Sequence, residues 1–170
     1  GIVIKEVDRK RLDMMCNSST HQGVAAYAAS HEYASMDDVF ALAEERNEKP
    51  FIIICDELED PHNLGAILRT AEATGGHGVI IPKRRNASLS YVVGKASAGA
   101  VEYVPVVRVA NLAQTMEELK EKGIWFYGAD MDGRSWCDVD YDGGVGLVIG
   151  SEGKGISRLV KEKCDFIVSM

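Results

Sequence analysis

The stretch Asp56–Gly75, which reads DELEDPHNLGAILRTAEATG, decides the fold because it joins a buried strand to a helix. The five residues before it, FIIIC at 51–55, form an apolar run typical of a strand buried on both faces. Asp60 can cap the following helix, Pro61 suits its first turn, and the glycine pair at 75–76 ends it. We therefore expect a strand, an acidic turn and a helix in succession.

Two polar residues stand out on this helix. Its apolar residues share one face, at spacings of three and four: Leu64, Ile67, Leu68 and Ala71. Asn63 lies at the helix start, and Arg69 lies off the apolar face, with a side chain that can reach back towards the preceding turn. Ligands of α/β proteins bind at the carboxyl ends of buried strands, so both are candidate functional residues. Structural readings stay open, because Asn63 can satisfy backbone groups and Arg69 can pair with Glu72.

Apolar runs and helical periodicity alternate along the rest of the chain. Further strands are predicted at residues 2–7, 24–29, 78–81, 104–109, 124–129, 145–149 and 165–168. Helices are predicted at residues 8–16, 35–46, 88–95, 111–122 and 154–163. This alternation predicts an α/β fold with a mainly parallel sheet, since parallel strands need helical crossovers between them.

Length and composition limit the class of protein. A chain of 170 residues, 46% of them hydrophobic, is large enough for one domain with a sizeable core. It contains no apolar run that could cross a membrane and no signal-peptide pattern. The four cysteines and four histidines are scattered without a C-x-x-C pair, which favours reduced thiols in a cytoplasmic protein without a metal site.

The charge distribution bears on nucleic-acid binding. A formal net charge of −7 does not suit phosphate contacts, which need a basic surface. Two local clusters are basic, Lys83-Arg84-Arg85 after a predicted strand and a second set near the N-terminus, made of Lys5, Arg9, Lys10 and Arg11. A solvated surface is the plain structural reading of both clusters, and it suits the N-terminal set better.

A second glycine-rich motif, Gly150–Gly155 (GSEGKG), follows the predicted strand at 145–149. Its spacing is neither the dinucleotide fingerprint G-x-G-x-x-G nor a P-loop, which requires Ser or Thr after the lysine. Glu152 would repel a phosphate, and the turn at 56–60 is equally acidic. The pair of loops suits a cationic ligand without phosphate, and S-adenosylmethionine fits that description. A tight turn with a solvated Glu152 is the alternative.

Three motifs in order carry a family resemblance: NLGAILRTAEATG at 63–75, VIGSEGKGIS at 148–157 and CDFIVSM at 164–170. With HQG at 21–23 and SAGA at 97–100, they resemble the SpoU (TrmH-type) branch of the SPOUT RNA methyltransferases. The resemblance runs from about His21 to the end of the chain. Within this branch the chain looks most similar to the large-subunit rRNA guanosine 2′-O-methyltransferase subgroup.

The resemblance implies a fold and an assembly. It implies a mainly parallel α/β sheet whose C-terminal segment forms a trefoil knot, an exception to the rule that chains are unknotted. Residues 1–20 would be the remnant of an L30e-like RNA-binding domain with its linker, and residues 21–170 the catalytic domain. The family's third motif continues beyond Met170, so a truncated domain with an incomplete knot is expected. A homodimer is also implied.

The resemblance also implies an activity and a site. The reaction would move a methyl group from S-adenosylmethionine to a ribose 2′-hydroxyl of structured RNA, in this subgroup a guanosine of large-subunit rRNA. The positions that match the family's catalytic residues are Asn63, Arg69 and Glu152. Those that match its cofactor-binding residues are Gly128, Ala129, Gly150 and Met170. No metal takes part.

Other functions stay open at this point. A tRNA ribose, or an adenosine whose methylation gives antibiotic resistance, would suit the same catalytic domain. A binding module without catalysis would be expected to lose Asn63, Arg69 or Glu152, and all three are present. A nucleotide-dependent oxidoreductase of doubly wound fold would need the dinucleotide fingerprint, which is missing, and the acidic loops also count against it.

Overall fold

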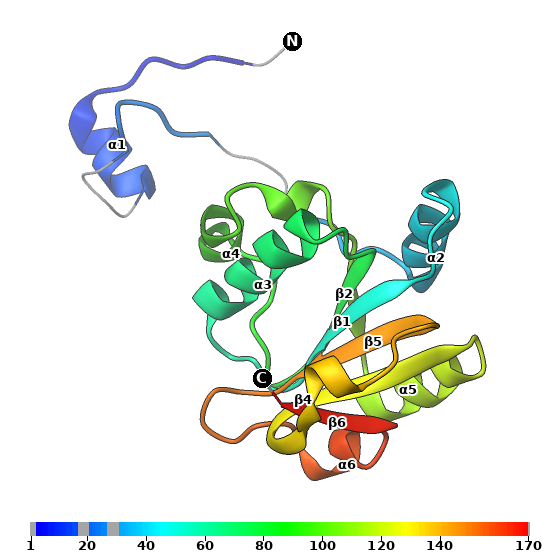
Figure 1. Cartoon of the computed structure of the whole chain (residues 1–170). Helices are drawn as coiled ribbons and strands as arrows, with labels where there is room; N and C mark the ends of the chain where they lie inside the picture. The colour runs from blue at the N-terminus through cyan, green and yellow to red at the C-terminus, as the bar shows by residue number, and fades with distance from the viewer. Residues whose placement is uncertain (1–2, 17–20, 27–30, 170) are drawn as a thin grey trace. The chain divides into compact units, whose positions relative to one another are not determined.

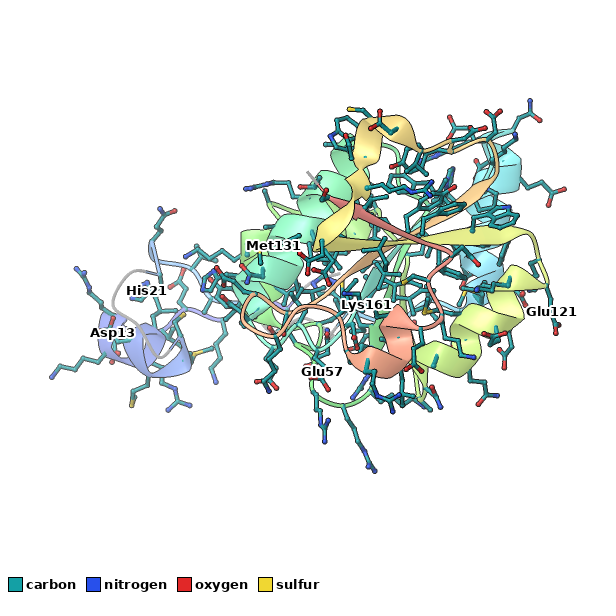
Figure 2. The ribbon with its side chains drawn as sticks, turned by 60° about the horizontal axis from the view of Figure 1, so that its bottom comes forward. Asp13, His21, Glu57, Glu121, Met131 and Lys161 are labelled. Carbon is teal, nitrogen blue, oxygen red and sulfur yellow. The ribbon has the colours of Figure 1, made fainter. Side chains whose placement is uncertain are left out.

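A computed structural model describes residues 3–16, 21–26 and 31–169 of the chain. Two compact units are present, Gly1–Ser30 and His31–Met170, and each is described by itself. In the first unit the helix α1 (Arg9–Cys16) forms as expected, and His21 Nε2 lies 3.1 Å from Asp13 Oδ1 (Figure 2).

The two strands predicted in this first unit do not form. Residues 3–7 and 24–26 have no strand structure, so the predictions at 2–7 and 24–29 are wrong there. Residue 2 and residues 27–29 lie outside the described part of the chain. A strand needs neighbours that satisfy its backbone and cover its apolar face, and these short runs pair with no strand among the described residues of their unit.

The second unit is built on a six-stranded sheet (Figure 1). Its strands are β1 (Phe51–Cys55), β2 (Gly78–Pro82), β3 (Val106–Val109), β4 (Ile124–Ser135), β5 (Gly144–Ile149) and β6 (Phe166–Ser169). Their order is β3-β2-β1-β5-β4-β6, and every pairing in this sheet is parallel. The predicted α/β class with a parallel sheet is confirmed.

Helices cover the sheet. They are α2 (Met36–Glu45), α3 (Pro61–Ala73), α4 (Tyr91–Ala96), α5 (Leu112–Lys120) and α6 (Arg158–Lys161), with short 3₁₀ turns η1 (Ala100–Glu102) and η2 (Trp136–Asp138). The side chains of successive residues in β1 point to opposite faces of the sheet and belong to two separate hydrophobic clusters. Ile53 packs with residues of α3 and α4, and Ile52 with residues of α2 and α5. The central strand is therefore buried on both faces, as its apolar run predicts.

The helix α3 forms as the sequence predicts. Asp60 Oδ1 accepts a hydrogen bond of 2.8 Å from the backbone N–H of His62, and Pro61 occupies the first turn. The helix ends at Ala73, and Gly75 takes the left-handed conformation with φ +76°. Gly65 is needed for packing, because a Cβ there would lie 2.4 Å from the Cβ of Ala96 in α4.

Most predicted boundaries differ from those observed by three residues or fewer, and two elements differ more. The helix predicted at 154–163 is only the single turn α6, because Gly155 has φ +67° and residues before Arg158 are held in a loop. The strand predicted at 124–129 continues as β4 to Ser135, with a shift in its pairing to β6 between Ala129 and Arg134. Gly133 allows this close approach, since a Cβ there would lie 2.5 Å from the carbonyl carbon of Val168.

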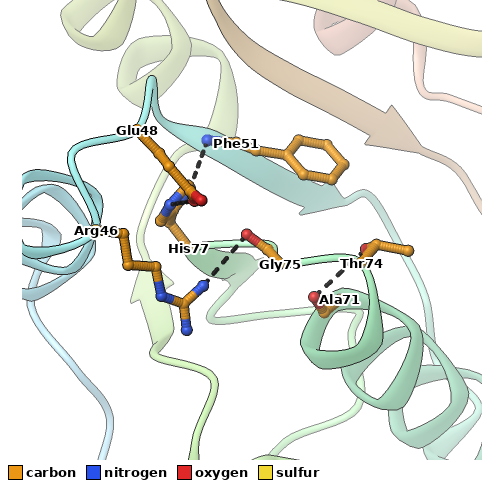
Figure 3. A network of polar contacts seen from close by, with 7 residues as sticks. All are labelled: Arg46, Glu48, Phe51, Ala71, Thr74, Gly75 and His77. Atoms are coloured by element: carbon orange, nitrogen blue, oxygen red, sulfur yellow. Dashed lines mark hydrogen bonds and ion pairs between the residues drawn. The ribbon is translucent and has the colours of Figure 1, made fainter.

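A buried histidine joins the amino ends of β1 and β2 (Figure 3). The Nδ1 atom of His77 accepts the backbone N–H of Phe51 at 2.9 Å, and its Nε2 lies 3.0 Å from Glu48 Oε2. Because Nδ1 is an acceptor, Nε2 carries the proton and donates a hydrogen bond to the carboxylate. The imidazole thus ties the loop after α2 to both strands.

Candidate functional site

The two motifs predicted to carry function lie side by side at the carboxyl edge of the sheet. One follows β1 and the other follows β5, and these strands pair with Cys55 opposite Ile149. From β1 the chain proceeds to β2 and β3 on one side, whereas β4 and β6 lie beyond β5 on the other. Ligands of α/β sheets bind at such a switch point, in the crevice beyond the carboxyl ends of the strands.

Asp56 holds the two motif segments together. Its backbone N–H donates to the carbonyl of Ile149 at 2.8 Å, and its buried carboxylate accepts the N–H of Ser157 at 2.6 Å. The first bond continues the pairing of β1 with β5, and the second fixes the end of the glycine-rich loop. The sequence offered one signal for this role, an acidic residue directly after a buried strand.

The glycine-rich loop closes on itself between Ser151 and Gly155. The Ser151 N–H donates to the Gly155 carbonyl at 3.1 Å, and the Gly155 N–H donates back to Ser151 at 2.8 Å. Any side chain at Gly150 would collide with this closure, since its Cβ would lie 2.1 Å from the Gly155 carbonyl carbon. The loop therefore requires glycine at position 150 and favours it at 155.

An acidic cavity of about 230 Å³ lies between the two motifs. Its lining residues are Glu57, Leu58, Glu59, Asp60, Asn63, Ser151, Glu152, Gly153 and Lys154. The cavity brings together Asn63 and Glu152, two of the three residues predicted to be catalytic. Four carboxylates, of which Glu57 is paired with Arg85, against one lysine in the lining favour a cationic ligand. The Ser151 hydroxyl oxygen is buried, and in the described part of the chain nothing hydrogen-bonds to it.

Arg69, the third predicted catalytic residue, lies apart from this cavity. Its side chain is exposed on α3 and lines neither this cavity nor the second one described below. Among the described residues no ion pair joins Arg69 to Glu72, so that structural reading is not realised. Its role as a catalytic residue stays a prediction.

The predicted cofactor-binding residues are divided between different surroundings. Ala129 lines a second, apolar cavity of about 740 Å³, with Phe51, Asp130, Met131, Trp136, Tyr141, Val145, Leu147, Ile149 and Val168. Gly128 instead faces the core, where a Cβ would lie 3.0 Å from the sulfur of Cys164. Gly150 belongs to the closed loop, and Met170 lies outside the described residues.

An ion pair borders the apolar cavity. Lys161 of α6, labelled in Figure 2, donates a hydrogen bond to Asp130, and its Nζ lies 2.6 Å from Oδ2. This hydrogen bond lowers the pKa of Asp130 and raises the pKa of Lys161. Sequence reasoning missed this pair, as well as Asp56 and Ser151, because each depends on contacts between distant segments.

In the ranges 3–16, 21–26 and 31–169, no group of three or more His, Cys, Asp or Glu side chains is arranged to hold a metal ion. Within the same ranges, no helix has the length and apolar character needed to cross a membrane.

Two family models match the chain. Residues 50–170 match the SpoU rRNA Methylase family, a match that spans more than half of the 170 residues. Residues 1–34 match the model described as RNA 2′-O ribose methyltransferase substrate binding. The first match contains both motif loops and every residue predicted to form the site.

Proteins of similar sequence carry related names. A Bacillus subtilis (strain 168) protein, YacO, is named as a TrmH family tRNA/rRNA methyltransferase and is 56% identical over 171 residues. That match covers all of this chain and 68% of the relative. A Staphylococcus aureus (strain MSSA476) protein with the same family name is 48% identical over 170 residues, 99% of this chain and 68% of the relative.

Solved structures with a similar fold carry the same family names. A Porphyromonas gingivalis structure, titled as an RNA methyltransferase of the TrmH family, matches with TM-score 0.67 and 31% identity over 72% of this chain and 50% of its own. The SpoU methyltransferase AviRb from Streptomyces viridochromogenes, in complex with AdoMet, matches with TM-score 0.71 and 27% identity over 82% of this chain and 53% of its own. With the family model and the close relatives, these matches lead to one conclusion: the chain belongs to the SpoU rRNA methylase family.

Proposed function

We propose that this protein transfers a methyl group from S-adenosylmethionine to a ribose 2′-hydroxyl of structured RNA. The observation that carries the proposal is the placement of Asn63 and Glu152 in one acidic cavity, although they come from different motifs. Membership of the family, the names of the relatives and the AdoMet complex of AviRb support the same reaction.

The residues present fit this cofactor. S-adenosylmethionine supplies a methyl group bonded to a positively charged sulfur, which makes that carbon electrophilic. Carboxylates around the cavity complement a cation, and the unpaired Ser151 hydroxyl offers it a hydrogen-bonding partner. We propose that Gly150, Met170, Gly128 and Ala129 complete the cofactor site, with Gly150 and Met170 acting mainly through their backbone.

The catalytic residues would then position the substrate. Asn63 and Glu152 would hydrogen-bond to groups around the reacting centre, so that oxygen, carbon and sulfur lie in line. A guanidinium is protonated at any physiological pH, which makes Arg69 a poor general base. We propose that Arg69 binds a phosphate beside the target ribose and stabilises the developing alkoxide.

The substrate and assembly are finer proposals. We propose a guanosine of large-subunit rRNA as the target, with a tRNA ribose as the second candidate, because relatives are named tRNA/rRNA methyltransferases. We also propose a cytoplasmic homodimer without a catalytic metal, a trefoil knot at the C-terminal side, and residues 1–20 as the end of an RNA-binding domain. The substrate-binding model that matches residues 1–34 supports the last point.

The test is methyl transfer by the full-length protein. Labelled S-adenosylmethionine is incubated with unmodified large-subunit rRNA or tRNA, and the labelled nucleosides are identified after digestion. We expect label in 2′-O-methylguanosine from rRNA, and its complete loss in Arg69→Ala. Arg46→Ala, which removes an exposed arginine at the amino edge of the sheet, is the matched control and should keep activity.

Each other outcome has a defined meaning. Near-normal transfer by Arg69→Ala would overturn the role of that residue. Label in tRNA alone would show that a tRNA ribose, the second candidate, is the substrate. Binding of RNA by the wild-type protein without any transfer would leave a binding module with a methyltransferase fold.

A further inference from the structure

The acidic cavity creates a problem for an RNA substrate. Glu57, Glu59, Asp60 and Glu152 line it, and the whole chain carries a formal net charge of −7. Carboxylates repel the phosphodiester groups on both sides of a target ribose. The RNA backbone must therefore approach along a part of the rim where positive charge is exposed.

Such a part is the segment 83–87, which we call the basic loop. It follows β2, the neighbour of β1 in the sheet, and so lies at the same carboxyl edge as the acidic turn. Lys83, Arg84 and Arg85 are all exposed. Arg108 of the neighbouring strand β3 adds a further exposed guanidinium. Its Nη2 donates a hydrogen bond to the Lys83 carbonyl at 3.2 Å.

The basic loop is fastened to the turn that lines the acidic cavity. The Leu58 N–H donates to Asn86 Oδ1 at 2.7 Å, and the Ala87 N–H donates to the Leu58 carbonyl at 2.7 Å. Arg85 Nη1 lies 3.1 Å from Glu57 Oε1, and Glu57 stands on the turn between β1 and α3 (Figure 2). These bonds fix the loop relative to the cavity.

The three basic side chains consequently have different roles. Arg85 is paired with Glu57, so its charge is largely compensated. For Lys83 and Arg84, no carboxylate in the described part of the chain forms an ion pair. Two uncompensated cations on a fixed loop offer a preorganised contact for neighbouring phosphates.

We propose that Lys83 and Arg84 bind backbone phosphates of the RNA next to the target nucleotide, while the Arg85–Glu57 pair positions the loop. This inference rests on the proposed function. It explains how an acidic protein holds a polyanion, since the positive charge is concentrated beside the site. Lys83 and Arg84 are then positioning residues for the substrate and contribute no chemistry.

The experiment compares two double variants of the full-length protein. Lys83→Ser with Arg84→Ser removes the proposed contacts. Lys49→Ser with Lys122→Ser removes the same charge from exposed positions that precede β1 and β4, at the opposite edge of the sheet. Binding to an unmodified large-subunit rRNA transcript is measured between about 50 and about 200 mM KCl, since this range resolves phosphate contacts. Methyl transfer and S-adenosylmethionine affinity are measured on the same samples.

The two variants should differ in their salt dependence. Each phosphate contact contributes about 0.7–0.9 to the slope of log affinity against log salt, so the first variant should lose about 1.5. Its KM for RNA should rise at low salt, with kcat and cofactor affinity unchanged. The control variant should keep the wild-type slope.

An unchanged slope in Lys83→Ser/Arg84→Ser, or an equal loss in the control, would overturn the inference while leaving the methyl transfer of the wild-type protein untouched. Absence of transfer by the wild-type protein would instead overturn the proposed function. If the wild-type protein binds no RNA at all, both fail.

Discussion

Gly150 and Gly153 belong to the same loop, yet their surroundings are opposite. A Cβ at Gly150 would lie within 2.3 Å of three backbone atoms of Gly155 and Ile156, whereas one at Gly153 would meet nothing within 4 Å. Gly153 also has no positive φ. The loop can therefore accept a methyl group at one position and not at the other.

We predict that Gly150→Ala opens the loop and reduces methyl transfer, with a loss of stability of about 1–3 kcal/mol, typical of overpacking at a rigid position. Gly153→Ala should keep the stability of the wild-type protein. Thermal unfolding and S-adenosylmethionine titration of the two variants would check this. Equal behaviour of both variants would contradict the geometry of the loop.

At the scale of residues, the sequence predicts part of the candidate site. Asn63 and Glu152 were predicted because each stands in a motif whose local pattern is readable, and their roles stay predictions. The roles of Asp56 and Ser151 are not identified from the sequence, since they depend on contacts between distant segments. No local pattern records which distant strand becomes a neighbour.

Among the elements, β1 and β2 depend on a shared polar contact at their amino ends. His77, only 2% exposed, is bonded on both ring nitrogens (Figure 3). Its backbone N–H also donates to the Phe51 carbonyl at 2.8 Å. Removal of the ring would leave the N–H of Phe51 without an acceptor inside the protein.

We predict that His77→Ala costs roughly 2–4 kcal/mol of unfolding free energy, from the unpaired Phe51 N–H together with the cavity left by the ring. Glu48→Gln keeps an acceptor oxygen for Nε2 and should cost far less, because Glu48 is half exposed. Urea denaturation of both variants measures the difference. Similar midpoints for the two would show that the imidazole is not the essential link.

The prediction of elements succeeds where local signals are strong. Helix α3 has a cap, a proline and a terminal glycine, and it forms within these limits. The helix predicted at 154–163 is much shorter, because the bond from Ser157 to Asp56 and the closed loop hold the chain away from helical geometry. The extension of β4 depends on β6 as a partner, which the residues 124–129 alone do not indicate.

At the scale of the whole molecule, the reactivity of the free cysteines measures how often the sheet unfolds. Cys55 is fully buried in β1, and burial raises its pKa to about 12. Burial likewise raises the pKa of Cys164 to about 12, whereas Cys137 is exposed on η2. At pH 8 a thiol of pKa 12 is a thiolate in only about one molecule in ten thousand.

We predict that a thiol reagent modifies Cys137 first and reaches Cys55 only through unfolding of the sheet. The modified peptides would be identified by mass spectrometry at increasing urea concentrations. Labelling of Cys55 should rise together with the unfolding transition. A Cys137→Ser variant, as the control, should leave the rate of Cys55 labelling unchanged. Rapid labelling of Cys55 without denaturant would contradict a tightly packed sheet.

The neighbours of β1 also set an order of events during synthesis. As the chain leaves the ribosome, β2 becomes available soon after β1, but β5 follows only after β3 and β4. Until then one edge of the apolar strand β1 has no partner, and a nascent chain exposes it to chaperones or to aggregation. The two loops of the candidate site are joined only when residues 144–149 arrive. If translation ends before these residues are made, the released chain forms only part of the sheet and its two site loops are not joined.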